Sequence, residues 1–251
     1  ASGATSTVGG GLRNTASGAL SIVAGGTSNT ASGATSTVGG GGINSANATF
    51  STISGGLSNT VTSAGQTSTI GGGTVNTVSG LRSTIGGGVR NTVSGNYTTI
   101  GGGNNNKASG QFSAIGGGVG NFTVNGTGAV VGGGVSNTAS EATSTVAGGI
   151  FNTASNEQAS IGGGASNTAS GNHSTVSGGR SNICSNIGSS IGGGRLNSAT
   201  GSYSKIGGGI SNTASGATST VGGGTLNNVQ GDTSTISGGQ GDTAIGFRAT
   251  I

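Results

Sequence analysis

The chain has 251 residues, of which 61 are glycine, five are phenylalanine and two are tyrosine, and it contains no proline, methionine or tryptophan. So few large side chains cannot fill the thick core of an ordinary globular domain, and glycine that does not recur at every third residue excludes collagen. The net charge of +4 comes from eight basic residues against four acidic ones, and the basic residues are scattered along the chain rather than clustered as a nucleic-acid site requires.

A valine or isoleucine anchor recurs through the whole sequence, almost always at every fifteenth residue. The step lengthens to 17 residues between Ile53 and Ile70 and to 16 between Ile115 and Val131. A fixed period of this length, carried by apolar residues, is typical of a solenoid in which every coil repeats one small core. We therefore predict an all-β chain, a parallel β-solenoid (β-roll) of about 16–17 coils with 15 residues per coil. The anchors are Val8, Val23, Val38, Ile53, Ile70, Ile85, Ile100, Ile115, Val131, Val146, Ile161, Val176, Ile191, Ile206, Val221, Ile236 and Ile251.

Read from its anchor, each coil follows the consensus (V/I)-G-G-G-x-x-N-T-A-S-G-x-x-S-T. It contains two short alternating segments, S-T-V and N-T-A-S, which we expect to form parallel strands that stack on the next coil. Alternation places serine, the anchor, asparagine and alanine inside, and threonine outside. The glycine runs predict sharp corners in which φ can be positive.

The inward asparagine is the most specific residue of the coil, because a buried amide is costly unless it is hydrogen-bonded. In a stack of identical coils, its side chain can bond to the coil above, the coil below or a nearby corner. The predicted inward ladder consists of Val8, Val23, Val38, Ile53, Ile70, Ile85, Ile100, Ile115, Asn14, Asn29, Asn59, Asn76, Asn91, Asn137, Asn152 and Asn167.

The pattern predicts one continuous solenoid over residues 1–251, with corner insertions near 62–65 and 122–128. No apolar run approaches the length of a membrane span, so we expect no membrane insertion in this segment. The chain begins in mid-repeat without an initiator methionine and shows no capping segment. We therefore expect an excerpt or a processed product whose ends present sticky strand edges that can stack end to end.

Groups capable of catalysis are few. His173 occupies an outward position, and we expect the four acids, Glu141, Glu157, Asp232 and Asp242, to lie several coils away from it. Cys184 replaces a small apolar residue of the repeat and is expected to be buried and inert. We therefore predict no enzymatic activity, no cofactor and no metal site.

Two outward columns of threonine form the most regular surface. One column precedes the anchors, where it shares its side with Phe50, Tyr97 and other large residues, and the second follows the asparagines. The second column is more uniform, although Lys107, Phe122 and Ile183 interrupt it. Threonine favours strands for structural reasons alone, so the columns also have a purely structural explanation. The candidate outward face consists of Thr15, Thr30, Thr60, Thr77, Thr92, Thr138, Thr153, Thr168 and Thr213.

The alternation of N-T-A-S-G with S-T-(V/I)-G-G-G, as in residues 29–33 and 36–41, resembles the YadA-like head repeats of trimeric autotransporter adhesins and repeats of phage tail fibres. That family implies a left-handed parallel β-roll, assembled as a homotrimer on a cell surface and binding host matrix or other cells. Its heads generally use a slightly shorter period. The segments N-T-V-S-G at 76–80 and 91–95 are similar to repeats of grass antifreeze β-rolls.

These observations lead to two functional hypotheses. The first is an extracellular structural or adhesive β-solenoid, a segment of a surface fibre, filament or adhesin head that associates with itself end to end or as a trimer. The alternative is an ice-binding protein that uses the regular outward Thr/Ser face. Oligomeric state and thermal hysteresis distinguish the two.

Overall fold

The computed structural model describes all residues from Ala1 to Ile251 and confirms the predicted parallel β-solenoid of about sixteen turns, with about 15 residues per coil and no helix. The chain divides into two compact units, Ala1–Thr123 (unit 1) and Val124–Ile251 (unit 2). Because no helix is present, no element has the form of a helical membrane span.

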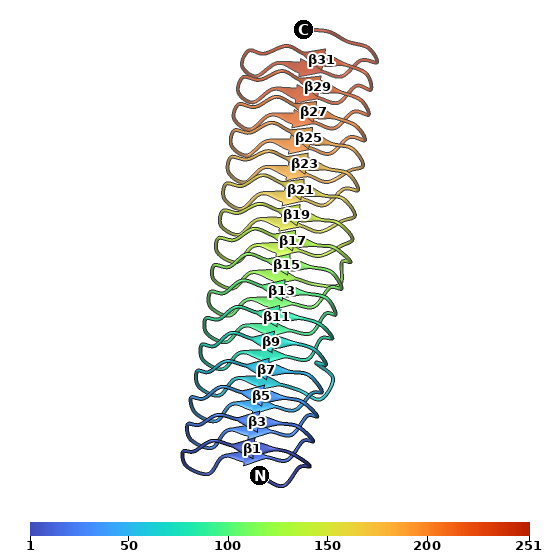
Figure 1. The fold of residues 1–251 in the computed structure, drawn as a ribbon. Coiled ribbons are helices and arrows are strands. Elements are labelled where there is room, and N and C mark those ends of the chain that lie inside the picture. The colour runs from blue at the N-terminus through green and yellow to red at the C-terminus, as the bar shows by residue number, and fades with distance from the viewer. The chain divides into compact units, whose positions relative to one another are not determined.

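In both units every coil contributes one strand to each of two parallel sheets, and neighbouring coils pair in register (Figure 1). Thr84 pairs with Thr99 and Ile85 pairs with Ile100, for example, so identical residues lie one above another. The anchor sheet of unit 1 runs in the order β1 (Thr7–Val8), β3 (Ile22–Val23), β5 (Thr37–Val38), β7 (Thr52–Ile53), β9 (Thr69–Ile70), β11 (Thr84–Ile85), β13 (Thr99–Ile100) and β15 (Ala114–Ile115). Its second sheet runs β2 (Thr15–Ala16), β4 (Thr30–Ala31), β6 (Ser45–Ala46), β8 (Thr60–Val61), β10 (Thr77–Val78), β12 (Thr92–Val93), β14 (Lys107–Ala108) and β16 (Phe122–Thr123).

Unit 2 repeats this arrangement. Its anchor sheet runs β17 (Val130–Val131), β19 (Thr145–Val146), β21 (Ser160–Ile161), β23 (Thr175–Val176), β25 (Ser190–Ile191), β27 (Lys205–Ile206), β29 (Thr220–Val221) and β31 (Thr235–Ile236). Its second sheet runs β18 (Thr138–Ala139), β20 (Thr153–Ala154), β22 (Thr168–Ala169), β24 (Ile183–Cys184), β26 (Ser198–Ala199), β28 (Thr213–Ala214), β30 (Asn228–Val229) and β32 (Thr243–Ala244).

The third side of each coil is the stretch after the anchor, G-G-G-x-x. It contains no regular strand, but the fourth residue after the anchor makes an isolated parallel bridge to its counterpart in the next coil, as Leu57 does to Thr74 and Thr74 to Val89. The N–H of Val89 donates to the carbonyl of Gly103 at 2.8 Å. Each unit is therefore closed by two sheets and one side of single bridges.

The glycine run explains only part of the corner geometry. The third glycine of each run has positive φ, for example 89° at Gly88, as the sequence predicts. Each coil also has left-handed residues at two further corners, and most of them are not glycine, such as Ser58 and Phe50 at φ 56° and 57°. An isolated left-handed residue costs about 1–2 kcal/mol, so the stacking of neighbouring coils imposes this conformation against local preference.

The irregular steps are absorbed at corners. Beyond residues 62–65, where the N–H of Gly65 donates to the carbonyl of Thr62, the ladder resumes with Thr77 paired to Thr60. In unit 2, the N–H of Val124 reaches the carbonyl of Ala139, whereas Val130 already shows the regular bond to Ser144. The extra residue therefore lies between Val124 and Val130, at the start of unit 2.

Candidate binding faces

The interior of the solenoid is filled by the ladder residues. Every anchor from Val23 to Ile236 and every asparagine from Asn29 to Asn227 is buried, while Val8 and Asn14, in the first coil, are half-buried. Because these columns are committed to packing, the candidate binding surfaces are the outward positions.

Each ladder asparagine uses its whole amide, as its burial requires. In Asn91, Nδ2 donates to the carbonyl of Gly87 at 3.0 Å and to the carbonyl of Gly103 at 2.9 Å, and Oδ1 accepts the N–H of Asn106 at 3.0 Å. One side chain thus closes the glycine corner of its own coil and ties that coil to the next. These bonds confirm the expectation that the amide joins a neighbouring coil and a corner.

The threonines of the candidate outward face lie on the outer side of the second sheet, in register along each unit. They are half-buried, except for the exposed Thr15, and their hydroxyls form no hydrogen bond within the chain. Neighbouring threonines on successive coils are separated by the parallel-strand spacing of about 4.8 Å. The face therefore presents free hydroxyls at regular intervals.

The serines beside these threonines behave differently. Ser79 Oγ donates to the carbonyl of Val93 at 3.4 Å, and Ser215 Oγ donates to the carbonyl of Val229 at 3.2 Å. Several serine hydroxyls of the T-A-S face therefore donate hydrogen bonds to carbonyls of the next coil. The hydroxyls that remain free at regular intervals are those of threonine.

The anchor sheet presents a second threonine face, which precedes the anchors and is more regular in unit 1 than the large residues near it in the sequence suggest. Thr37, Thr52, Thr69, Thr84 and Thr99 occupy five successive coils of unit 1 without interruption. This run is longer than any threonine run of the T-A-S face. The large residues that share its side of the coil lie at a separate, left-handed corner.

That corner carries an exposed aromatic cluster in unit 1. The rings of Tyr97 and Phe112 stack with centroids 5.1 Å apart and an interplanar angle of 21°. The guanidinium carbon of Arg82 lies 5.7 Å from the Tyr97 ring centroid, and Arg82 Nη1 donates to Tyr97 Oη at 3.3 Å. Since all three residues occupy the same left-handed position on consecutive coils, the fold itself brings them together.

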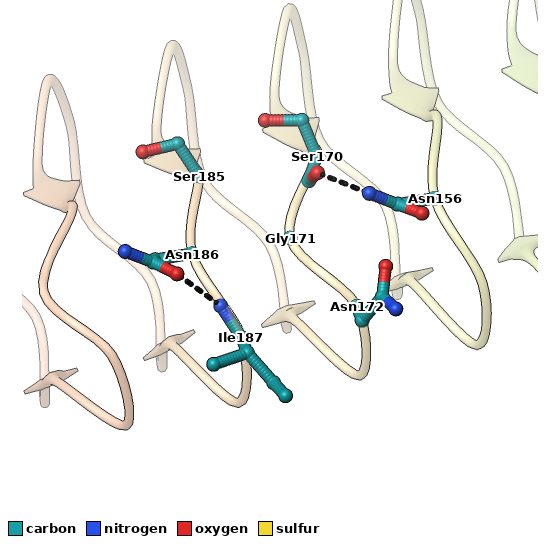
Figure 2. Close-up of a pocket in the computed structure, with 7 residues that line it drawn as sticks. All are labelled: Asn156, Ser170, Gly171, Asn172, Ser185, Asn186 and Ile187. Atoms are coloured by element: carbon teal, nitrogen blue, oxygen red, sulfur yellow. Dashed lines mark hydrogen bonds between the residues drawn. The ribbon is translucent and has the colours of Figure 1, made fainter.

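Unit 2 has a shallow polar pocket at the corner that follows its second sheet (Figure 2). Asn156 and Asn186 replace the usual glycine on the coils before and after Gly171, so their side chains form the two walls. Asn156 Nδ2 donates to the carbonyl of Ser170 at 3.0 Å, and Asn186 Oδ1 accepts the N–H of Ile187 at 2.8 Å. Because both side-chain amides bond to the backbone, we interpret the pocket as a structural feature of this corner rather than as a binding site.

The titratable groups are spread over the surface, and no group of three or more His, Cys, Asp and Glu side chains could hold a metal ion. One expectation about them is wrong. Glu157 lies on the coil next to His173, because the His173 N–H donates to the Glu157 carbonyl at 2.9 Å. The two residues are 16 positions apart in the sequence, close to the 15-residue period. A count in units of the period therefore predicts that they lie on neighbouring coils.

Cys184 is buried in the alanine column between Ala169 and Ala199. Burial raises the pKa of its thiol from 9.0 to about 11, against the smaller opposing effect of hydrogen bonds that include Sγ to the Thr175 carbonyl at 3.3 Å. A thiol held neutral in this way is a poor nucleophile.

Comparison of the chain with protein-family models and with curated protein sequences finds no match. Inference about function therefore rests on the faces themselves.

Proposed function

We propose that this chain is an extracellular structural or adhesive β-solenoid, a segment of a surface fibre, filament or adhesin head that associates with itself end to end or as a homotrimer. The observation that supports the proposal is that the inward and outward positions of the coil have separate roles. The inward columns are buried and pack the core, while the outward columns repeat threonine on most coils with the hydroxyls free of bonds within the chain. Such a surface suits extended, repetitive contact better than recognition of a single small molecule.

Adhesion by such a surface gains strength from repetition. Weak contacts that recur on many coils act together, because once one is made the next is effectively intramolecular. The partners we propose are a second copy of the chain and the matrix or cell surface of a host. The extracellular location is supported by the resemblance of the repeats to surface adhesins.

The molar mass in solution tests self-association. One chain has a mass of 23.0 kDa. We expect light scattering to give a multiple of this value, rising with protein concentration until a stable state, such as a trimer, is reached. A mass of one chain at every concentration would reject the self-associating fibre or adhesin.

A second candidate function, ice binding, is favoured by one specific observation: the unpaired threonine hydroxyls that stand in register on the T-A-S face. A free hydroxyl array with the spacing of the coils can order water over a flat area. In this case we expect a monomer that produces thermal hysteresis.

Substitution within the face locates the activity. Thr92→Tyr in unit 1 and Thr153→Tyr in unit 2 place a bulky ring in the hydroxyl array and should abolish hysteresis. The matched control Thr84→Tyr lies on the anchor sheet and should leave it unchanged. Absence of hysteresis in the unsubstituted chain rejects ice binding, and loss only in the control assigns it to the other face.

A further inference from the structure

The middle glycine of the G-G-G run is present in every coil. Backbone conformation favours glycine at Gly72 and Gly163, where φ is 154° and 156°, but the other members of the column have no such φ. The middle glycine is half-buried to exposed on the third side of the coil. A Cβ built on Gly87, Gly148 or Gly193 would meet no atom within 4 Å. The column consists of Gly10, Gly25, Gly40, Gly55, Gly72, Gly87, Gly102, Gly117, Gly133, Gly148, Gly163, Gly178, Gly193, Gly208, Gly223 and Gly238.

The first and third glycines of the run, by contrast, are constrained by contacts within the chain. The third glycine is required by the fold, because at Gly88 φ is 89° and a Cβ would lie 2.7 Å from Asn91 Nδ2. The first glycine is crowded, since a Cβ on Gly9 would lie 2.6 Å from the Ala24 carbonyl oxygen. Even so, that position accepts Ala24 and Ser54 among other replacements. The crowded position varies, whereas the open one never does.

Two further features distinguish the middle-glycine side. The N–H groups of the middle glycines, such as Gly87 and Gly102, make no hydrogen bond within the chain. Beside them, the fourth position after the anchor carries exposed aliphatic residues on some of the coils, including Leu57 at 48%, Val89 at 39% and Val119 at 47% exposure. A furrow without side chains therefore lies next to an apolar ridge. We name this surface the glycine–aliphatic face, made of the middle glycines together with Leu12, Leu57, Val89 and Val119 in unit 1 and Val135, Ile150 and Ile210 in unit 2.

We propose that the glycine–aliphatic face is the lateral interface between copies of this chain, in which the aliphatic ridge of one copy packs into the glycine furrow of another. Glycine within a strand-like segment commonly marks close approach of another backbone. The furrow recurs once in every coil, whereas the ridge is interrupted by residues such as Thr27, Thr74 and Asn104. A partner can occupy the whole furrow only if it has the same axial repeat. A second copy has that repeat. The inference rests on the proposed self-association and assigns it a surface.

The available area is compatible with this assignment. The side from the middle glycine to the fifth residue after the anchor covers about 60 Å² per coil, from about 3.3 Å per residue and about 4.8 Å per coil. The eight coils of one unit then offer about 500 Å² per partner, or about 1,000 Å² over both copies, which is the lower bound of a specific interface.

Arg180 and Arg195 are the charged members of the aliphatic column, on neighbouring coils. Both are exposed. An arginine can cover apolar surface with its stem while its charge reaches water at the rim, so the two residues can border the interface without being buried in it.

Paired substitutions test the assignment in the full chain by sedimentation equilibrium. Gly102→Leu fills the furrow at a position where the chain itself has room, so the fold should be retained while the dissociation constant rises at least about tenfold. Val89→Asp, which leaves every glycine in place, should have the same effect. The control Ser94→Leu adds an equal side chain to an exposed position on the T-A-S face and should leave association unchanged.

Circular dichroism shows whether each variant is folded, and Gly102→Ala replaces Gly102→Leu if the larger side chain prevents folding. Association that is unchanged in both Gly102→Leu and Val89→Asp, or weakened equally by Ser94→Leu, would overturn the assignment of this face while self-association stands. A parent chain that is monomeric at every concentration would overturn the proposed function as well.

Discussion

Units 1 and 2 share the same coil structure but differ in the charged and aromatic side chains that they carry. Unit 1 carries Arg13, Arg82, Arg90 and Lys107 and no acidic residue, so the whole net charge of +4 belongs to it. Unit 2 carries four basic and four acidic residues, and their charges cancel. Unit 1 has the stack of Arg82, Tyr97 and Phe112, whereas Gly188 stands between His173 and Tyr203 in the corresponding column of unit 2.

The inward columns differ far less. Valine and isoleucine replace each other at the anchor, and valine, Thr123 or Cys184 replaces alanine in the second column, but every coil up to Asn227 has its asparagine. The comparison teaches that the fold depends on a few inward positions, which leaves the outward ones free to vary. The middle glycine is the exception, since it faces outward and does not vary.

The largest expected effect concerns the asparagine ladder, in which the two units should be equal. Asn91→Ala in unit 1 and Asn167→Ala in unit 2 each remove two donated bonds. Asn91→Ala also removes two accepted bonds, and Asn167→Ala removes one. The buried backbone groups left without partners should lower the free energy of unfolding by about 3–5 kcal/mol in either case. Chemical denaturation followed by circular dichroism measures both losses.

The matched control is Asn228→Ala, since Asn228 stands on the outer side of its strand. It should change the free energy of unfolding by less than about 0.5 kcal/mol. A loss at Asn91 or Asn167 no larger than at Asn228 would mean that the ladder does not hold the coils together.

The second prediction concerns Cys184, which occurs in unit 2 alone. Because burial raises the folded-state pKa from 9.0 to about 11, the folded chain retains the thiol proton to higher pH than the unfolded chain does. The free energy of unfolding should be unaffected by this group below pH 9 and should fall by about 2–3 kcal/mol as the pH rises to 11.

Cys184→Ala isolates this contribution, because its neighbours Ala169 and Ala199 show that alanine fits the column. The stability difference between parent and variant, measured by denaturation from pH 8 to pH 11, should change over that window. A difference that does not depend on pH would contradict the burial of the thiol.

The third and smallest effect concerns the aromatic corner. Tyr97→Ala in unit 1 removes both a ring stack and the contact with Arg82, and should cost about 1 kcal/mol more than Tyr203→Ala in unit 2. A double-mutant cycle of Tyr97 with Phe112 should give a coupling of about 0.5–1.5 kcal/mol. No coupling would mean that the rings are neighbours without stabilising each other.

The sequence alone predicts the solenoid, the two strand segments and the buried ladder, because these depend on period and alternation. It does not predict the left-handed corners at residues such as Phe50, since their conformation is imposed by the neighbouring coil against local preference. Nor does it separate the three glycines of each run. Only the three-dimensional structure shows that Gly88 is fixed by the fold, whereas Gly87 has open space around it.

The same limit applies to the outward faces. Threonine columns can be read from the sequence, but which hydroxyls are free depends on bonds such as that from Ser79 to the Val93 carbonyl. The adjacency of His173 and Glu157 follows from coil geometry, because residues one period apart lie on neighbouring coils.

Hydrogen exchange at the middle glycines tests the central claim most directly, because their N–H groups have no acceptor within the chain. Measured by NMR at increasing protein concentration, the amides of Gly87 and Gly102 should exchange freely in dilute solution and become protected as copies associate. Solvent-exposed backbone amides on the other sides of the coil should show no such change in protection. Amides that remain unprotected in the assembled protein would contradict the assignment of this face to another copy of the chain.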